Sequence, residues 1–187
     1  GYRYYDTAKV PVKYPFGYGL SYTDFTQELE SSSMENGEIT INVKVTNTGD
    51  IAGKDVVEVY YNPPYTNGGI EKSTANLIGY EKTNELKPGE SQTVTISFTA
   101  EDMASYDYLE NGCYVLEAGD YEISINSDSH NVIDSVTYTV DEDIVYDEAN
   151  PRSTDLTAAV NQFGYADGHL TYLSRKDGFK NYDETTA

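Results

Sequence analysis

The sequence predicts an all-β protein: a seven-stranded antiparallel, immunoglobulin-like sandwich with extended N- and C-terminal segments. Three observations predict it. Short runs alternate apolar with polar residues, turn signals recur between these runs, and no stretch carries a convincing apolar period of 3.6 residues. The region from residue 37 to residue 141 matches the roughly 100 residues that such a sandwich requires.

The clearest strand is residues 39–46, where isoleucine or valine at every second position alternates with a polar side chain. This pattern is typical of a strand with one buried and one solvated face. A turn at Asn47–Asp50 follows it. Six more strands are predicted from similar runs, at residues 56–61, 76–83, 94–98, 114–117, 121–125 and 136–140.

Proline and glycine mark the connections. Residues 63–69 read as a long loop, because two prolines interrupt ladder pairing and two glycines loosen the chain. Pro88 and Gly89 give a strong turn signal between two strands. Tyr121 follows a turn at the start of a strand, so it is either a tyrosine corner or an inward-facing core residue.

The two ends differ from this central region. Residues 26–37 read as a polar linker or turn. Residues 142–187 are acidic with sparse apolar side chains, which makes them a poor core builder, and we expect extended or partly ordered chain there. The expected organisation is therefore three parts, namely residues 1–36, 37–141 and 142–187.

Charge excludes two classes of partner. Lys and Arg total 12 against 32 Asp and Glu, which gives a formal net charge of −20. That charge opposes phosphate backbones and anionic membrane surfaces, so no nucleic acid and no membrane are expected as partners. A single cysteine excludes an intrachain disulfide framework and leaves the compartment undecided.

The segment Tyr14–Phe25 alternates aromatic residues with glycines, an order suited to close packing of a loop or strand end. Together with Gly1–Asp6 it resembles the end of the second catalytic domain of family 3 glycoside hydrolases, the β-glucosidase and β-xylosidase family. The central region resembles the fibronectin type III-like domain that accompanies those catalytic domains. The matching segments are residues 43–50, 52–60, 77–82, 86–91 and 118–121.

The C-terminal segment departs from the usual layout of that family, in which this domain closes or nearly closes the chain. Residues 169–179 look like the lead-in to the barrel domain of the family's reordered branch, where the barrel follows the sandwich. Residues 63–65 and 69–73 also look like that branch.

The resemblance implies a parent enzyme that hydrolyses β-linked glucosides or xylosides with retention, using an Asp on the barrel and, in most members, a Glu on the second domain. Neither motif is in this chain, so no catalytic residue is expected here. The chain is expected to be a non-catalytic accessory module that braces the catalytic domains of the same parent chain. The alternative is an independent carbohydrate-binding or adhesion module. An enzyme in its own right is not expected, and the sugar preference is left open.

Several polar groups are candidates for a catalytic or metal-binding site, but no cofactor-binding residue and no metal ligand is predicted among them. The acidic run at residues 141–148 favours a solvated linker over an acid/base pair or a calcium site. The oxygen-rich residues 126–131 favour a surface turn over a cation site, and both histidines favour surface positions. Cys113 favours a strand position over a nucleophile. The residues in question are Asp141, Glu142, Asp143, Asp147, Glu148, His130, His169 and Cys113.

The remaining expectations concern the tyrosines and the ring-rich N-terminal segment. Tyr60, Tyr61, Tyr65 and Tyr80 either pack the sandwich against its catalytic domains, which is favoured, or form a face for sugar rings. Residues 14–25 are too rich in rings for a solvated tail, so we expect them to lie against the sandwich or a second copy of the chain. Residues 142–187 are expected to be the more mobile end.

Overall fold

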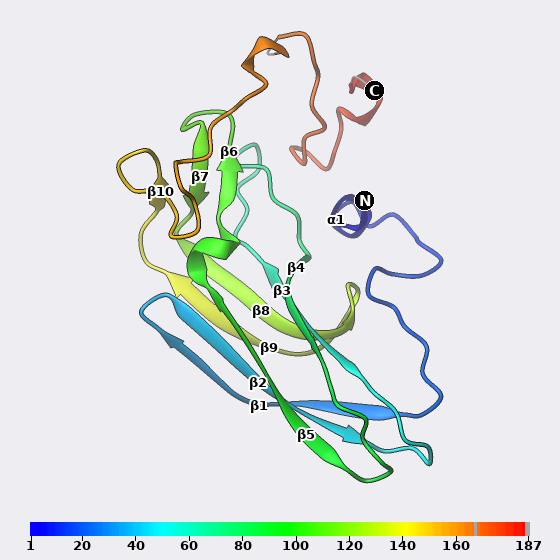
Figure 1. The fold of residues 1–187 in the computed structure, drawn as a ribbon. Helices are drawn as coiled ribbons and strands as arrows, with labels where there is room; N and C mark the ends of the chain where they lie inside the picture. Colours follow the sequence, from blue (N-terminus) through cyan, green and yellow to red (C-terminus); the bar gives the residue numbers. More distant parts are fainter. Residues whose placement is uncertain (167, 186–187) are drawn as a thin grey trace. The chain divides into compact units, whose positions relative to one another are not determined.

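The computed structural model describes residues 1–166 and 168–185, in which ten strands, one short α-helix and three 3₁₀ turns occur (Figure 1). The residues cluster into two units. Unit 1 comprises residues 1–62, 73–102 and 121–138, and unit 2 comprises residues 63–72, 103–120 and 139 onward. The 3₁₀ turns are η1 (Ala100–Met103), η2 (Gly164–Ala166) and η3 (Tyr182–Glu184).

Unit 1 is built on two sheets whose paired strands run antiparallel. The three-stranded sheet has the order β1-β2-β5 and the four-stranded sheet the order β4-β3-β8-β9. Together they hold seven strands, so the predicted all-β fold class is confirmed. The strands are β1 (Phe25–Glu35), β2 (Glu38–Asn47), β3 (Val56–Asn62), β4 (Asn76–Lys82), β5 (Ser91–Thr99), β8 (Gly119–Asp128) and β9 (Asn131–Val140).

The core of unit 1 follows the period of two that the sequence shows. On β2, every second side chain from Ile39 to Val45 is at most 1% exposed, while the residues between them are partly exposed. Removing such a side chain from water contributes about 1.5–3 kcal/mol. Tyr121 on β8 is fully buried, which is compatible with both expected positions, a tyrosine corner and an inward-facing core residue. The opposite sheet contributes Val57, Val59, Ile123 and Ile125.

The expectation of a polar linker over residues 26–37 is wrong, because these residues form most of β1 and its turn. Asn36 and Gly37 have φ of 52° and 78°, which is the left-handed pair that a two-residue hairpin requires. Beyond the turn, β1 pairs with β2 from Glu35 opposite Glu38 back to Phe25 opposite Asn47. The strand was missed because it lies at a sheet edge and most of its side chains are exposed.

Unit 2 contains a small sheet of three short strands, in the order β10-β7-β6. The predicted strand at residues 114–117 is β7, but it belongs to this sheet and not to the sandwich. The acidic segment expected to be a linker contributes β10, whose Tyr146 is buried. Short strands of this kind are held by ladder bonds to a neighbour, which no local pattern reveals. The strands are β6 (Ser105–Asp107), β7 (Cys113–Leu116) and β10 (Ile144–Tyr146).

The N-terminal segment contacts the sandwich within unit 1. Helix α1 (Tyr2–Thr7), which the sequence did not predict, opens the chain. The Tyr2 ring stacks on Phe16 at 4.1 Å, and the Phe16 carbonyl accepts a hydrogen bond from the Ser129 N–H at 2.8 Å. Residues 14–25 are thus placed against the sandwich as expected, although Leu20 and Tyr22 remain 89% and 96% exposed.

One fully buried polar side chain joins the segments at the end of β2. Asn47 Oδ1 accepts hydrogen bonds from Thr23 Oγ1 at 2.9 Å and from the Gly49 N–H at 3.1 Å. Asn47 Nδ2 donates to the carbonyls of Ile51 and Leu86, both at 2.8 Å. Asn47 therefore ties the N-terminal segment, the β2–β3 connection and the β4–β5 connection to one strand.

Replacing this side chain tests its contribution. We expect Asn47→Ala to lower the free energy of unfolding by roughly 3 kcal/mol, because buried donors and acceptors lose their partners at about 1–3 kcal/mol each. Urea unfolding followed by circular dichroism measures the change. Asn42→Ala is the matched control, since Asn42 lies on the same strand but bonds Ser31 and Thr95 at the surface. Equal effects of the two substitutions would contradict the assigned role of Asn47.

Candidate functional site

A cavity of about 560 Å³ opens in unit 1 beside α1. Its wall combines α1 and the residues after it with β3 and the β8–β9 hairpin. The cavity brings together Tyr5, Asp6, Asn126, Ser129 and His130. Charged and polar side chains alternate in its wall with tyrosines and small apolar residues.

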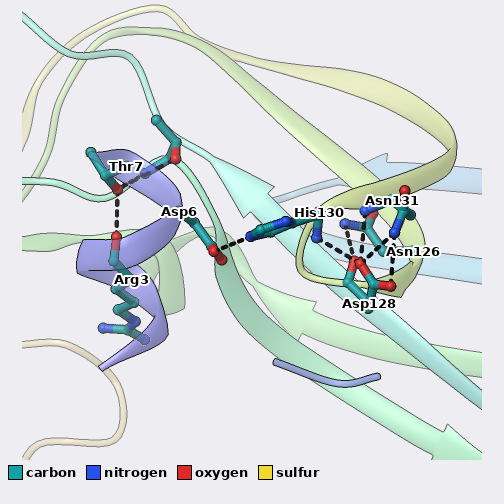
Figure 2. Close-up of polar contacts among 8 residues, drawn as sticks. Arg3, Asp6, Thr7, Asn126, Asp128, His130 and Asn131 are labelled. Carbon is teal, nitrogen blue, oxygen red and sulfur yellow. Dashed lines mark hydrogen bonds and ion pairs between the residues drawn. The ribbon is translucent and has the colours of Figure 1, made fainter. Parts of the chain in front are cut away.

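The polar centre of this cavity is a contact between residues 124 positions apart (Figure 2). His130 Nε2 lies 2.5 Å from Asp6 Oδ1, and the pair is an ion pair when the imidazole is protonated. The Asp6 side chain is only 6% exposed, against 37% for His130. Thr7 holds the end of α1 here, because its Oγ1 donates to the Arg3 carbonyl at 2.6 Å and accepts from the Thr74 N–H at 3.0 Å.

The oxygen-rich residues 126–131 comprise the end of β8, the two-residue turn at 129–130 and the first residue of β9, and Asp128 organises this hairpin end (Figure 2). Asp128 Oδ1 accepts hydrogen bonds from the backbone N–H groups of His130 and Asn131 at 2.9 and 3.0 Å. Both Asp128 oxygens accept from Asn131 Nδ2. Because its oxygens are occupied in this way, Asp128 stabilises the turn between the strands. The expected turn is present, but its surface position is wrong for Asn126, Asp128 and Ser129, which are buried.

Three oxygens of the cavity wall have no internal partner. Asp6 Oδ2, Asn126 Oδ1 and Ser129 Oγ are buried and accept or donate no hydrogen bond among the residues that the structure describes. Buried polar atoms in folded proteins are almost always paired. These three oxygens have almost no accessible surface, so the residues line the cavity through their other atoms. Sequence reasoning missed Asp6, since nothing in its local pattern connects it to the β8–β9 hairpin.

The carboxylates of the acidic run at residues 141–148 lie on the surface. Asp141, Glu142 and Glu148 are exposed. Asp143 accepts from the Ala118 N–H at 2.6 Å, and Asp147 accepts from the backbone of the turn that follows it. Across residues 1–166 and 168–185, no three His, Cys, Asp or Glu side chains gather in a way that suits a metal ion. The arrangement agrees with a solvated run and not with a paired acid and base.

Cys113 and His169 belong to unit 2 and are not among the residues that line the cavity. Cys113 is 4% exposed on β7, and burial raises the pKa of its thiol, with nearby Asp147 and Asp107 adding to the shift. A thiol of this kind is a poor nucleophile. His169 is exposed in the C-terminal segment.

The four tyrosines considered as a sugar-binding face differ in their surroundings. Tyr60 is 1% exposed, and its hydroxyl donates to Glu58 Oε2 at 2.7 Å. The Tyr65 ring is covered by the Arg175 guanidinium, 4.0 Å from the ring centre. Tyr80 is 68% exposed, whereas Tyr61 is half-buried. A buried ring and a covered ring cannot present their faces to a sugar, so these four do not make one platform.

The C-terminal segment is fastened within unit 2. Ser174 Oγ donates to Glu71 Oε1, and the Arg175 N–H donates to Glu71 Oε2 at 2.9 Å. Arg175 Nη1 donates to the Lys72 carbonyl at 3.1 Å. Asn67 and Asp177 exchange two further bonds. These contacts hold residues 174–177 to the loop at residues 63–72. The sequence analysis expected a mobile segment at residues 142–187 and did not predict these contacts.

Hydrogen exchange can measure this fastening. We expect Glu71→Ala to raise amide exchange at residues 174–177 about tenfold, because charge-assisted bonds of this type contribute about 1.5 kcal/mol. Strands β2 and β3 should exchange at the wild-type rate. Glu110→Ala, at an exposed position of unit 2, is the control. Unchanged exchange in Glu71→Ala would show that Glu71 does not hold the segment.

Alkylation tests the inert character of Cys113. With iodoacetamide at pH 8, we expect the native chain to react at least about a hundredfold more slowly than the chain in urea, because the thiol is buried and its pKa is raised. Mass spectrometry follows the reaction. Rapid alkylation of the native chain would restore Cys113 as a candidate nucleophile.

None of the helices in the described part of the chain is both long and apolar enough to span a membrane.

Comparison with known proteins identifies what the chain is similar to. The family described as the fibronectin type III-like domain matches residues 55–129. A β-glucosidase of Ruminococcus albus is 39% identical over 179 residues, which cover 92% of this chain and 18% of that protein. Among solved structures, β-glucosidase 3B from Thermotoga neapolitana in complex with α-D-glucose has a TM-score of 0.71 at 38% identity, covering 78% of this chain and 20% of the other. The GH3 β-glucosidase of Bifidobacterium adolescentis has a TM-score of 0.68 at 31% identity, covering 75% and 20%.

The chain thus spans about a fifth of the length of each of these relatives. The chain carries a fibronectin type III-like domain of the kind found in family 3 β-glucosidases.

Proposed function

We propose that this chain is a non-catalytic accessory module of a family 3 β-glycosidase, and that it braces the catalytic domains of the same parent chain. The observation that carries the proposal is the extent of the matches. Nearly all of this chain aligns with a β-glucosidase, yet it accounts for about a fifth of that protein. A module in this position has the remaining four-fifths of the parent protein as its neighbour.

The surface of the N-terminal segment supports a bracing role. Large apolar side chains of this segment remain partly or largely exposed, although the Phe16 ring stacks on Tyr2. Exposed apolar surface of this kind favours burial against a partner. The same segment resembles the end of the second catalytic domain, so the catalytic part of the parent is the proposed cover. The exposed side chains are Tyr14 at 61%, Phe16 at 43%, Tyr18 at 46%, Leu20 at 89% and Tyr22 at 96%.

The chemistry of the parent is proposed from the relatives. It is the hydrolysis of β-linked glucosides or xylosides by a retaining mechanism, which needs two carboxyl groups about 5 Å apart. The catalytic pair is assigned to the rest of the parent, since the acidic run of this chain is exposed and serves turns.

Domain order is also a proposal. We place the end of the second catalytic domain within residues 1–36 and let residues 142–187 lead toward the barrel. The match to the Ruminococcus albus relative covers 92% of the chain and so includes most of residues 142–187. This extent supports the reordered branch, in which the barrel follows the sandwich.

Reconstitution in trans tests the bracing role. The parent's catalytic part is produced without this segment, and the 187-residue chain is added to it. We expect saturable binding by isothermal titration and a melting temperature that rises with the concentration of added chain, because a ligand of the folded state stabilises it. This chain alone should not hydrolyse an aryl β-glucoside.

Two outcomes would contradict the proposal. One is an absence of binding to the catalytic part combined with saturable binding of cello- or xylo-oligosaccharides to this chain, which would favour a carbohydrate-binding module. The other is hydrolysis of the aryl β-glucoside by this chain alone.

A further inference from the structure

We propose that the end of the β8–β9 hairpin is a docking surface for the second catalytic domain of the parent, and that Val132 and Ile133 make the contact. This inference rests on the proposed bracing function. It adds a contact made by the sandwich itself, whereas the ring-rich segment resembles the end of the catalytic domain.

The exposed apolar side chains of β9 are confined to the end beside the hairpin turn. Val132 is 54% exposed and Ile133 is 43% exposed. Single exposed apolar residues are ordinary on a protein surface, whereas contiguous ones mark a contact. The exposed positions farther along the strand carry polar side chains, namely Asp134, Ser135, Thr137 and Thr139.

The two apolar side chains line different cavities of unit 1. Consecutive residues of a strand point to opposite sides. Val132 lies in the wall of the cavity beside α1, and Ile133 lies in the wall of a second cavity of about 590 Å³. The hairpin end therefore separates two hollows, and a partner that covers it meets both side chains.

The N-terminal segment contributes to the walls of both cavities. Tyr5, Val10 and Pro11 line the cavity beside α1, and Leu20 lines the second one. Leu20 is 89% exposed, so it and Ile133 offer apolar surface to the same hollow. One partner surface can thus cover the hairpin end together with the ring-rich segment.

Two polar contacts join the N-terminal segment to the turn that precedes Val132. The Ser129 N–H donates to the Phe16 carbonyl at 2.8 Å. His130 Nε2 lies 2.5 Å from Asp6 Oδ1 (Figure 2). The segment that resembles the end of the second catalytic domain is therefore already in contact with this hairpin end.

Chain continuity identifies the occupant. In the proposed domain order, residues 1–36 contain the end of the second catalytic domain, so that domain is tethered to the segment at the hairpin. A tethered partner has a high effective concentration beside its tether. A second copy of the chain has no such tether, and the formal net charge of −20 on each copy opposes its approach.

Hydroxyl-radical footprinting of the full parent and of the 187-residue chain tests the surface. We expect Val132 and Ile133 to be oxidised at least about fivefold more slowly in the parent, because the core of an interface excludes solvent. Tyr80 is the control, since it is 68% exposed and lines neither cavity, and its rate should be the same in both proteins.

The same measurement separates this proposal from the bracing function. If residues 14–22 are protected in the parent while Val132 and Ile133 react as in the isolated chain, the hairpin contact is wrong and the bracing function stands. If neither region is protected, both proposals are wrong.

A charged substitution separates a docking role from a structural one. Ile133 is partly exposed in the 187-residue chain, so Ile133→Asp should leave the urea midpoint of that chain nearly unchanged. In the parent it should raise the oxidation rate of Val132 at least about threefold, because an unpaired charge is costly within an apolar contact. Thr137→Asp adds the same charge at an exposed position outside both cavities and should have neither effect. Equal oxidation of Val132 in the two variants of the parent would overturn the proposal.

Cross-linking identifies the occupant directly. Ile133→Cys in the full parent is labelled with a benzophenone maleimide, for which the buried Cys113 competes little. Mass spectrometry then maps the peptide that is joined on illumination. We expect a peptide of the second catalytic domain. A peptide of the barrel, or a link between two copies of the sandwich, would overturn the proposal.

Discussion

The arrangement of unit 1 depends on one buried amide. Asn47 ends β2 and bonds to three other segments through Thr23, Gly49, Ile51 and Leu86. The fit is close, since a Cβ on Gly49 would lie 2.2 Å from Thr23 Oγ1 and 2.8 Å from the Asp24 backbone nitrogen. By holding Thr23, this amide fixes where the ring-rich N-terminal segment meets the sandwich. The same segment is continuous with α1, which forms part of the cavity wall. The cavity therefore depends on a hydrogen-bond network that lies outside its own wall.

The sandwich could be predicted because its core strands alternate strictly. On β2 each isoleucine and valine of residues 39–45 is buried, so the periodicity alone places the sheet. Edge strands carry no such signal. β1 was missed although Asn36-Gly37 is a known hairpin signal, because most residues of β1 before this turn are polar and exposed. β10 was missed because acidic neighbours surround three residues that are held only by pairing with β7.

The site could be predicted only in its local part. The oxygen-rich turn at residues 126–131 is visible in the sequence, and its Asp128 acts on neighbours within three positions. The Asp6–His130 contact is not visible, because it joins residues whose proximity follows from the path of the whole N-terminal segment. Whether a polar atom is buried or solvated likewise depends on the fold as a whole. Nothing in the local sequence shows that Asn126 Oδ1 and Ser129 Oγ are buried without partners among the described residues, while Asn131 Nδ2 donates to Asp128.

A structure of the full parent protein, by crystallography or electron microscopy, tests the account most directly. Bracing predicts that the ring-rich segment at residues 14–22 is covered by the catalytic part. It also predicts that no carboxylate of this chain reaches the sugar-binding pocket of the parent. A ring-rich segment that is uncovered and turned away from the catalytic domains would contradict it.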